Sequence, residues 1–244
     1  MRFCRRILVI VLLITLPTTV ALTVRRSGRT APAVWVTPSA PPPVTIARYG
    51  FEDPSPWGDL TPFTGNDARL RRVPHGGGRA VRFPAPCDRE PCPRMILRAL
   101  SRPALNPGRA LFSFGATVRL SARNTTDGQN VLQKGYAAEG SQYKLQIDGV
   151  AGHPSCVLVG EDSRAIHVVL ADVGVADGAW HAITCRRGRD TLTILVDGAP
   201  RAAVRIPAEL RIDNAMSLNL GGKSAHADND QFHGAVDDVW ISRP

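Results

Sequence analysis

Residues 177–198 read DGAWHAITCRRGRDTLTILVDG, and this stretch decides the fold. Two segments of strand character lie on either side of a basic turn at 186–190. The side chains that alternate along them are Trp180, Ala182 and Thr184 in the first segment and Leu192, Ile194 and Val196 in the second. Asp-Gly pairs at 177–178 and 197–198 supply the positive φ that tight turns need. We therefore predict a β-hairpin in which Trp180 faces the core.

Short segments of strand character recur on both sides of this hairpin. They are 46–51, 80–83, 95–100, 112–121, 130–135, 142–148, 155–160, 165–171, 202–206, 216–220 and 234–242. Residues 54–79 are rich in turn-forming types and are predicted to be loop, and residues 209–212 a single helical turn. About twelve strands without a helical period predict an all-β fold, an antiparallel sandwich or jelly roll.

Four short motifs occur in a characteristic order. They are Asp-Gly-x-Trp-His at 177–181, Val-Asp-Gly at 196–198, Asn-Leu-Gly-Gly at 219–222 and FHGAVDDVWI at 232–241. In this order they resemble the laminin-G-like, concanavalin A-like lectin/glucanase superfamily, over roughly residues 46–244 and most strongly after Phe112. The resemblance implies a two-sheet jelly roll of concanavalin A type.

The N-terminal region has the pattern of an export signal. Arg2, Arg5 and Arg6 precede an apolar run that ends at Val24, which predicts that residues 1–24 are either a cleaved signal peptide or a retained single membrane anchor. Residues 25–45 are a Pro-rich linker. In both cases we expect the domain at 46–244 to be secreted or at the cell surface, outside the cytoplasm.

Four of the five cysteines lie in the predicted domain, so disulfides are expected there. Four cysteines allow three connectivities. We favour Cys87–Cys92, which would clip a small loop, together with Cys156–Cys185, which would tie neighbouring strands. A zinc site is the alternative, but it lacks a Cys-x-x-Cys motif or a paired histidine spacing.

The formal net charge of +9 suits anionic cell-wall polymers, acidic polysaccharides or a negative membrane surface. Arginine-rich usage equally fits the base composition of the genome. Nucleic acid is not an expected partner, because the chain has no basic helix and no recognisable nucleic-acid-binding motif.

Catalysis is not expected. The β-glucan hydrolases of the superfamily deliver two carboxylates from one strand to the scissile bond, whereas the glutamates of this chain fall in predicted turns: Glu52, Glu90, Glu139, Glu161 and Glu209. Trp180 and His181 could stack on a sugar ring, but the pair looks structural in laminin-G-like proteins.

The resemblance also implies candidate sites. A calcium ion often bridges the start and end of such domains, so Asp238 and either Glu52 or Asp53 are candidate ligands of a structural Ca²⁺, with turn capping or pairing to arginine as the alternative. Asp237 is expected on the opposite strand face from Asp238. The polar loop 226–233 is predicted to be a solvated turn. Ligand-binding candidates on the concave sheet are Gln133, Lys134, Tyr143, Lys144, Gln146 and His167.

Taken together, these features predict an exported, non-catalytic binding module that recognises a glycan or protein at the cell surface or in the cell wall. A divergent glycoside hydrolase or lyase is the alternative. A structural domain at the tip of a stalk, without a small ligand, is the third possibility.

Overall fold

The computed structural model describes residues 42–52, 57–163 and 165–244. The predicted leader and most of the predicted linker lie outside these ranges, as does Asp53. The first strand, β1, spans Val44–Tyr49 and begins two residues before the predicted domain. None of the helices in the described ranges is long and apolar enough to span a membrane.

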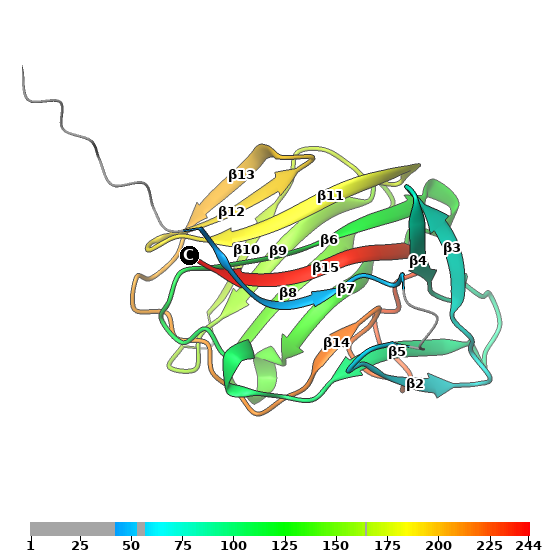
Figure 1. Cartoon of the computed structure of the whole chain (residues 1–244), viewed down its shortest axis with the longest axis horizontal. Coiled ribbons are helices and arrows are strands. Elements are labelled where there is room, and N and C mark those ends of the chain that lie inside the picture. The colour runs from blue at the N-terminus through cyan, green and yellow to red at the C-terminus, as the bar shows by residue number, and fades with distance from the viewer. Residues whose placement is uncertain (1–41, 53–56, 164) are drawn as a thin grey trace, which may run out of the picture. The chain divides into compact units, whose positions relative to one another are not determined.

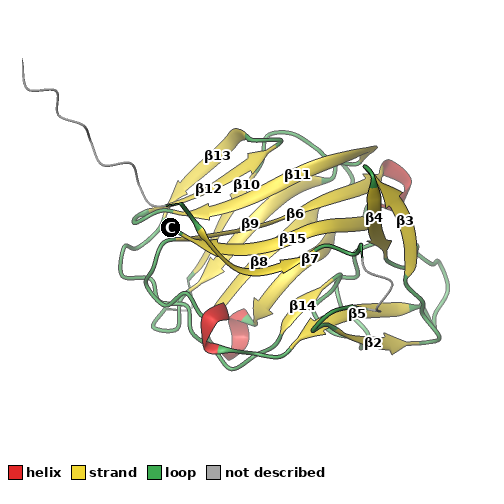
Figure 2. Cartoon of the chain, viewed as in Figure 1, coloured by secondary structure: helices red, strands yellow, loops and turns green. Residues whose placement is uncertain are grey.

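The described residues form two antiparallel sheets (Figures 1 and 2). In spatial order, the eight-stranded sheet contains β13 (Ala199–Arg205), β12 (Thr191–Val196), β11 (Asp177–Arg187), β6 (Phe112–Ser121), β15 (Ala235–Arg243), β4 (Gly78–Arg82) and β3 (Arg71–His75), with β1 pairing β15 beside β4. The seven-stranded sheet contains β10 (Ile166–Leu170), β9 (His153–Val159), β8 (Gln142–Asp148), β7 (Gly128–Gly135), β14 (Leu218–Leu220), β5 (Arg94–Ala99) and β2 (Thr61–Gly65). This confirms the predicted two-sheet sandwich.

The core lies between the two sheets, where strands such as β8 and β12 turn every second side chain inward, while β7 and β9 are buried along almost their whole length. At its centre, Phe112 and Phe114 of β6 pack on Tyr143 of β8, with ring centroids 5.5 and 5.2 Å from that of the tyrosine. Aromatic rings from both sheets therefore meet in one cluster, which fixes the two layers face to face.

The hairpin at 177–198 is confirmed as β11 and β12, and Asp197 and Gly198 take the positive φ values of a tight turn, 53° and 77°. The prediction that Trp180 faces the core is wrong. The inward side chains of β11 are Ile183, Cys185 and Arg187, and Trp180 is half-buried on the outer face. Asp177-Gly178 is a bulge inside β11, not a turn, and it lets the strand continue along β6.

Both predicted disulfides are present, but one of them connects different strands from those expected. Cys87 and Cys92 clip a loop that precedes β5. Cys156 lies on β9 and Cys185 on β11, so their bond crosses the core and joins the two sheets instead of tying neighbouring strands.

The prediction of loop over 54–79 is wrong for β2 and β3. Both are edge strands, each contains a proline, Pro62 or Pro74, and neither has a buried residue. Proline is tolerated at sheet edges, where one side of the strand needs no hydrogen bonds. The predicted helical turn at 209–212 is also wrong, because that segment forms a non-helical turn and a bridge from Ile212 to Gly108.

Candidate functional site

The alternation of β7 and β8 divides the predicted ligand-binding residues between the two faces of the seven-stranded sheet. Gln133 pairs with Lys144, and the next pair along is Lys134 with Tyr143. Tyr143 belongs to the core, so Lys134 shares the inner face with it, while Gln133 and Lys144 share the outer face.

The two inner residues hold the fold. Tyr143 is 0% exposed, and its hydroxyl donates to the carbonyl of Leu105 at 3.2 Å. Lys134 is also 0% exposed, and its Nζ donates to Asn214 O and Oδ1, both at 2.8 Å. Burial lowers the pKa of Lys134 to about 8. Neither side chain reaches the surface.

His167 lies at the edge of the seven-stranded sheet, where it pairs with the core residue Leu158 of β9. Its ring is partly buried, and its Nε2 is buried without a hydrogen-bond partner among the described residues. Because paired residues share a face, His167 points to the same side as Leu158, the inner side of the sheet. It is therefore separated from the polar residues that β7 and β8 place on the outer face.

The remaining predicted residues, Gln133, Lys144 and Gln146, lie on the outer face, and hydrogen bonds fix Gln133 and Gln146. Gln133 is 3% exposed, donates to Gly135 O at 2.8 Å and accepts from Asn130 Nδ2 at 2.7 Å. Half-buried Gln146 donates to Asp148 Oδ1 at 2.5 Å. Gln146 is thus partly accessible to a ligand, whereas Gln133 is buried and bonds to its neighbours on β7.

Loop residues complete this face, and sequence reasoning missed them. Asn219 of β14 accepts from Arg98 Nε at 3.2 Å and donates to Lys223 O at 2.7 Å, and Tyr136 donates to the same carbonyl at 2.5 Å. Lys223 Nζ lies 3.3 Å from a carboxylate oxygen of Asp230. The Asn-Leu-Gly-Gly motif at 219–222 marks where this loop begins, but no local pattern shows that the loop folds back over the sheet.

We call this surface the outer polar face. It consists of Tyr136, Lys144, Gln146, Asn219, Lys223 and Asp230. Burial lowers the pKa of Lys144, and the nearby carboxylates of Asp230 and Asp148 oppose that shift. The face thus presents one aromatic ring, two amides, two ammonium groups and one carboxylate, and bonds within the protein hold all of these residues but Lys144 in the part of the chain that the structure describes.

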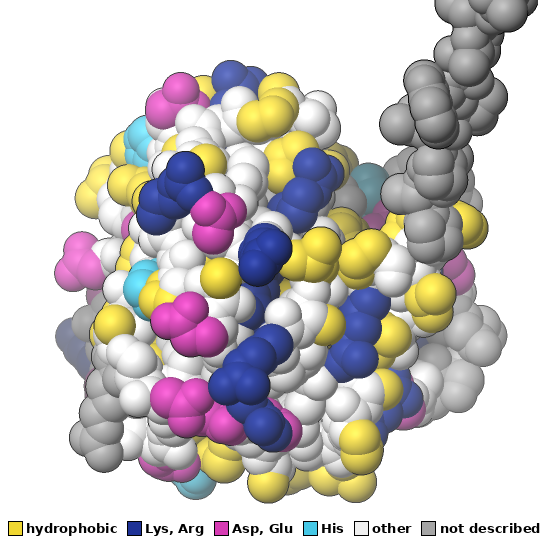
Figure 3. All heavy atoms as spheres, turned by 90° about the vertical axis from the view of Figure 1, so that its left-hand side faces the viewer, with side chains coloured by type: hydrophobic (Ala, Val, Ile, Leu, Met, Phe, Trp, Pro, Cys, Tyr) yellow, Lys and Arg dark blue, Asp and Glu magenta, His cyan; other side chains and the backbone are white. Residues whose placement is uncertain are grey.

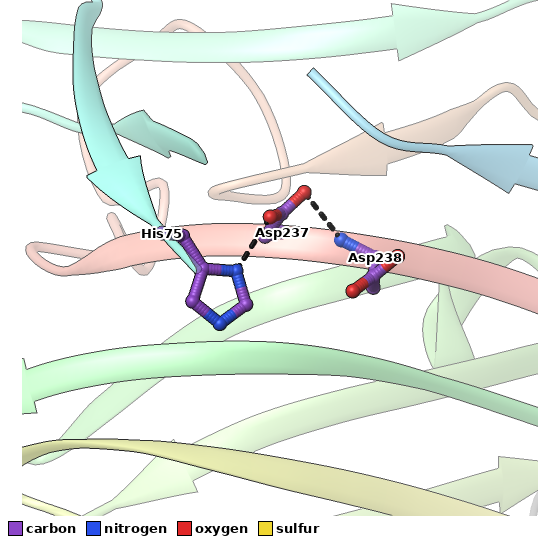
Figure 4. A group of neighbouring side chains, drawn as sticks. All are labelled: His75, Asp237 and Asp238. Carbon is purple, nitrogen blue, oxygen red and sulfur yellow. Dashed lines mark hydrogen bonds and ion pairs between the residues drawn. The ribbon is translucent and has the colours of Figure 1, made fainter. Parts of the chain in front are cut away.

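A second cluster lies on the other sheet. The β3–β4 hairpin lies at the edge of this sheet, next to β15 (Figure 1), and His75 at the end of β3 contacts residues of β15 and β11. His75 Nδ1 lies 2.6 Å from Asp237 Oδ2, and one ligand atom each of His75, Asp237 and Asp238 lies within 4.8 Å of the others (Figure 4). The ring of His75 also packs on Trp180, with centroids 4.1 Å apart.

The structure brings together only part of the predicted calcium set. Asp238 is in the cluster, and its Oδ1 lies 2.8 Å from Arg48 Nη2. Glu52 accepts from the backbone N–H of Arg79 at 2.8 Å, and Asp53 is outside the described residues. Asp237 and Asp238 lie on the same side, contrary to expectation, because a bulge gives Asp238 a φ of 44° and breaks the alternation.

These residues fit calcium incompletely. Calcium takes six to eight oxygen ligands, whereas His75 offers a nitrogen. Two of the carboxylate oxygens of the cluster already contact His75 or Arg48. An imidazole with two carboxylates is a donor set more typical of transition metals.

His181 joins the two ends of the β11–β12 hairpin. Its Nδ1 lies 2.8 Å from Asp197 Oδ2, and its Nε2 lies 3.1 Å from Asp177 Oδ1. Partial burial alone lowers the pKa of His181, but the bonds to Asp197 and Asp177 outweigh it, so the pKa is raised. His181 therefore links the bulge to the turn.

The five glutamates occupy loops or a short 3-10 turn, and none is on a strand. Glu90 pairs with Arg94, and Glu161 pairs with Arg211 at 2.8 Å. These carboxylates are bound to arginines on separate loops and do not form a pair on one strand.

Comparisons with known proteins identify the family of this fold. A family model described as the concanavalin A-like lectin/glucanases superfamily matches residues 99–243. The binding domain of Paraclostridial Mosquitocidal Protein 1 matches with a TM-score of 0.61 and 11% identity, over 82% of this chain and 48% of that one. The botulinum neurotoxin serotype D binding domain matches with a TM-score of 0.57 and 13% identity, over 81% and 47%.

Domain 4 of AbnA, an extracellular arabinanase from Geobacillus stearothermophilus solved in complex with arabinotriose, matches with a TM-score of 0.60 and 13% identity, over 82% of this chain and 93% of that domain. This chain therefore spans about half the length of the toxin domains and nearly all of the arabinanase domain. At these identities the likeness is one of fold. No curated protein matches the sequence.

Proposed function

Because this chain belongs to the concanavalin A-like lectin/glucanase superfamily, we propose that it is an exported, non-catalytic module that binds a glycan or a protein at the cell surface or in the cell wall. The outer polar face is the observation that carries the proposal. Hydrogen bonds hold Tyr136, Gln146 and Asn219 before any ligand arrives, and an ion pair holds Lys223 to Asp230, so binding costs little side-chain entropy at these residues.

The chemistry of the face favours a glycan. Sugars present hydroxyl groups to polar side chains and apolar ring faces to aromatic side chains. Gln146, Lys144 and Lys223 supply the donors, and Tyr136 supplies the ring. The ring is oriented because its hydroxyl bonds to Lys223 O.

Three further observations support the proposal. The arabinanase domain of this fold was solved with arabinotriose. The two disulfides suit an oxidising compartment outside the cytoplasm. The glutamates are on loops, which disfavours the alternative of a divergent glycoside hydrolase or lyase, since the hydrolases of this superfamily need a carboxylate pair on a strand.

The test is binding of the full chain to an array of neutral and cell-wall glycans, with Tyr136→Ala and Lys144→Ala as variants. We expect saturable binding that Tyr136→Ala weakens at least about tenfold, the loss of roughly 1.4 kcal/mol of stacking. Tyr49→Phe is the control, because it removes a buried hydroxyl far from this face. Binding that Tyr136→Ala leaves intact would refute the assignment of the face, and release of reducing sugar would favour the hydrolase.

A structural calcium ion stays our proposal for the region where the start and end of the domain meet, with Asp238 as its ligand in the cluster. The Arg48–Asp238 salt bridge would have to open to free that oxygen. We expect millimolar calcium to raise the melting temperature relative to chelator in the wild type but not in Asp238→Asn. Equal melting temperatures in the wild type would reject calcium.

A further inference from the structure

The strongest unassigned feature is a recess beside the β3–β4 hairpin, at the edge of the eight-stranded sheet. We call it the arginine recess. It has a volume of about 680 Å³, and its lining includes four arginines, Arg69, Arg71, Arg72 and Arg82, and four apolar residues that we call the proline wall, Phe83, Pro84, Pro86 and Pro93. Asp67 is the acidic residue among the lining residues.

The arginines of the recess repel one another in the protein alone. Arg71 of β3 lies directly opposite Arg82 of β4, and like charges directly opposite each other destabilise an antiparallel pair. Both side chains are exposed, and neither forms an ion pair within the ranges that the structure describes. An anion bound between them would remove this repulsion.

The positive charge continues across the sheet. Ala235 of β15 pairs with Arg82 on one side and with Arg119 of β6 on the other. Arg82 and Arg119 together line a second, smaller hollow of about 130 Å³, and the guanidinium of Arg119 lies 5.1 Å from the ring centroid of Trp180. With about 4.8 Å between strands, the row from Arg71 to Arg119 spans roughly 14 Å.

We propose that the arginine recess and this row bind the oxyanion groups of an acidic polysaccharide. A guanidinium pairs bidentately with a carboxylate or sulfate, and a row of three arginines along 14 Å suits an extended chain with repeated anionic groups. The proline wall, held by the Cys87–Cys92 disulfide, gives a rigid apolar surface for the backbone of the sugar.

Figure 3 shows the face on the left of Figure 1, away from β3 and β4, and there acidic side chains lie beside several of the basic ones. Mixed charges attract no single class of polymer, whereas the arginine recess is nearly uniform in sign. The site is separate from the outer polar face, so the full chain would carry two glycan sites on its two sheets.

The test measures binding of the full chain to polygalacturonate, dextran sulfate and neutral dextran, at about 0.05 and 0.5 M salt. The variant is Arg71→Gln/Arg82→Gln. The matched control is Arg186→Gln/Arg189→Gln, which removes the same charge from two exposed arginines outside the recess. We expect the recess variant to lose at least about tenfold affinity for an anionic polysaccharide and the control less than about twofold.

Each outcome bears on the proposal. Preference for polygalacturonate assigns carboxylate as the oxyanion, and preference for dextran sulfate assigns sulfate. Equal losses in both double variants would reduce binding to net charge and overturn the proposal. Wild-type binding to neither anionic polymer at low salt would also overturn it. Tyr136→Ala should retain binding to the anionic polysaccharide. The proposal for the outer polar face can therefore fail without affecting the proposal for the recess, and the reverse also holds.

The recess variant should also fold. Removing one pair of opposed like charges relieves repulsion, so we expect its melting temperature to equal or exceed that of the wild type. A lower melting temperature would show that Arg71 and Arg82 have a structural role in the absence of ligand and would overturn the assignment.

Discussion

The bond between Cys156 and Cys185 should be the larger contributor to stability of the two disulfides. Both cysteines are 0% exposed, and the bond joins β9 to β11 across the core. Its partners are 29 residues apart in sequence, against 5 for Cys87 and Cys92. Loop-closure entropy then predicts that Cys156→Ala/Cys185→Ala lowers the free energy of unfolding by roughly 3.5 kcal/mol, against about 2 kcal/mol for Cys87→Ala/Cys92→Ala.

The assay is urea unfolding of both double variants and the wild type, followed by tryptophan fluorescence. Alanine is the substitution because a buried serine hydroxyl would add a polar penalty of its own. Domains of ordinary stability have about 5–15 kcal/mol, so the variant should still fold, with a much lower midpoint. Equal losses in the two variants, or a loss below about 1 kcal/mol for the core pair, would refute the loop-entropy reasoning.

Three other predictions follow from single residues. Because burial lowers the pKa of Lys134 from 10.5 to about 8, the folded state holds that proton less tightly than the unfolded state. As pH rises from about 8 to about 10.5, the free energy of unfolding of the wild type should therefore increase by roughly 3 kcal/mol relative to that of Lys134→Met, as measured by urea unfolding. A difference between the two proteins that stays constant with pH would contradict this. Because the pKa of His181 is raised, its stabilisation is complete below its unfolded value of about 6.5 and is lost as pH rises through the folded value. His181→Asn should therefore lower the urea midpoint more at pH 5.5, about one unit below the unfolded value, than at pH 8, more than one unit above it. A larger loss at pH 8 would contradict this prediction. Gly135 has a φ of 80°, and a Cβ there would clash with Ser141 O. Gly135→Ala should lower the free energy of unfolding by about 3 kcal/mol in the same assay. Gly76 has a φ of 53° but open space around it, so Gly76→Ala should lower that free energy by about 1 kcal/mol. Equal losses would show that the clash with Ser141 O contributes nothing.

The sequence predicts those elements whose side chains alternate. The strands at 112–121 and 142–148 have the predicted bounds, because every second residue faces the core and the periodicity is local. That the four cysteines of the domain pair was also predictable from their even number, and the preferred connectivity, one of three possible, is the one present.

Long-range contacts were not predictable. The β3–β4 hairpin carries His75 to Asp237, a residue 162 positions later in the chain, and no local pattern encodes that distance. The same holds for Lys223, whose carbonyl is held by Tyr136 and Asn219. The face to which Trp180 points was mispredicted because its large apolar ring favours burial, whereas the regular alternation of β11 places Ile183, Cys185 and Arg187 on the core side and Trp180 on the other.

The position of β15 sets an order of events for the newly made chain. This strand pairs with β1, β4 and β6, and Val44 lies opposite Arg243. None of those three strands can complete its ladder on that side until residues 235–243 have been made, so much of the eight-stranded sheet must wait for one late segment. Such distant contacts slow folding, and here they leave the exposed edges of β1, β4 and β6 without their shared partner until β15 has been made.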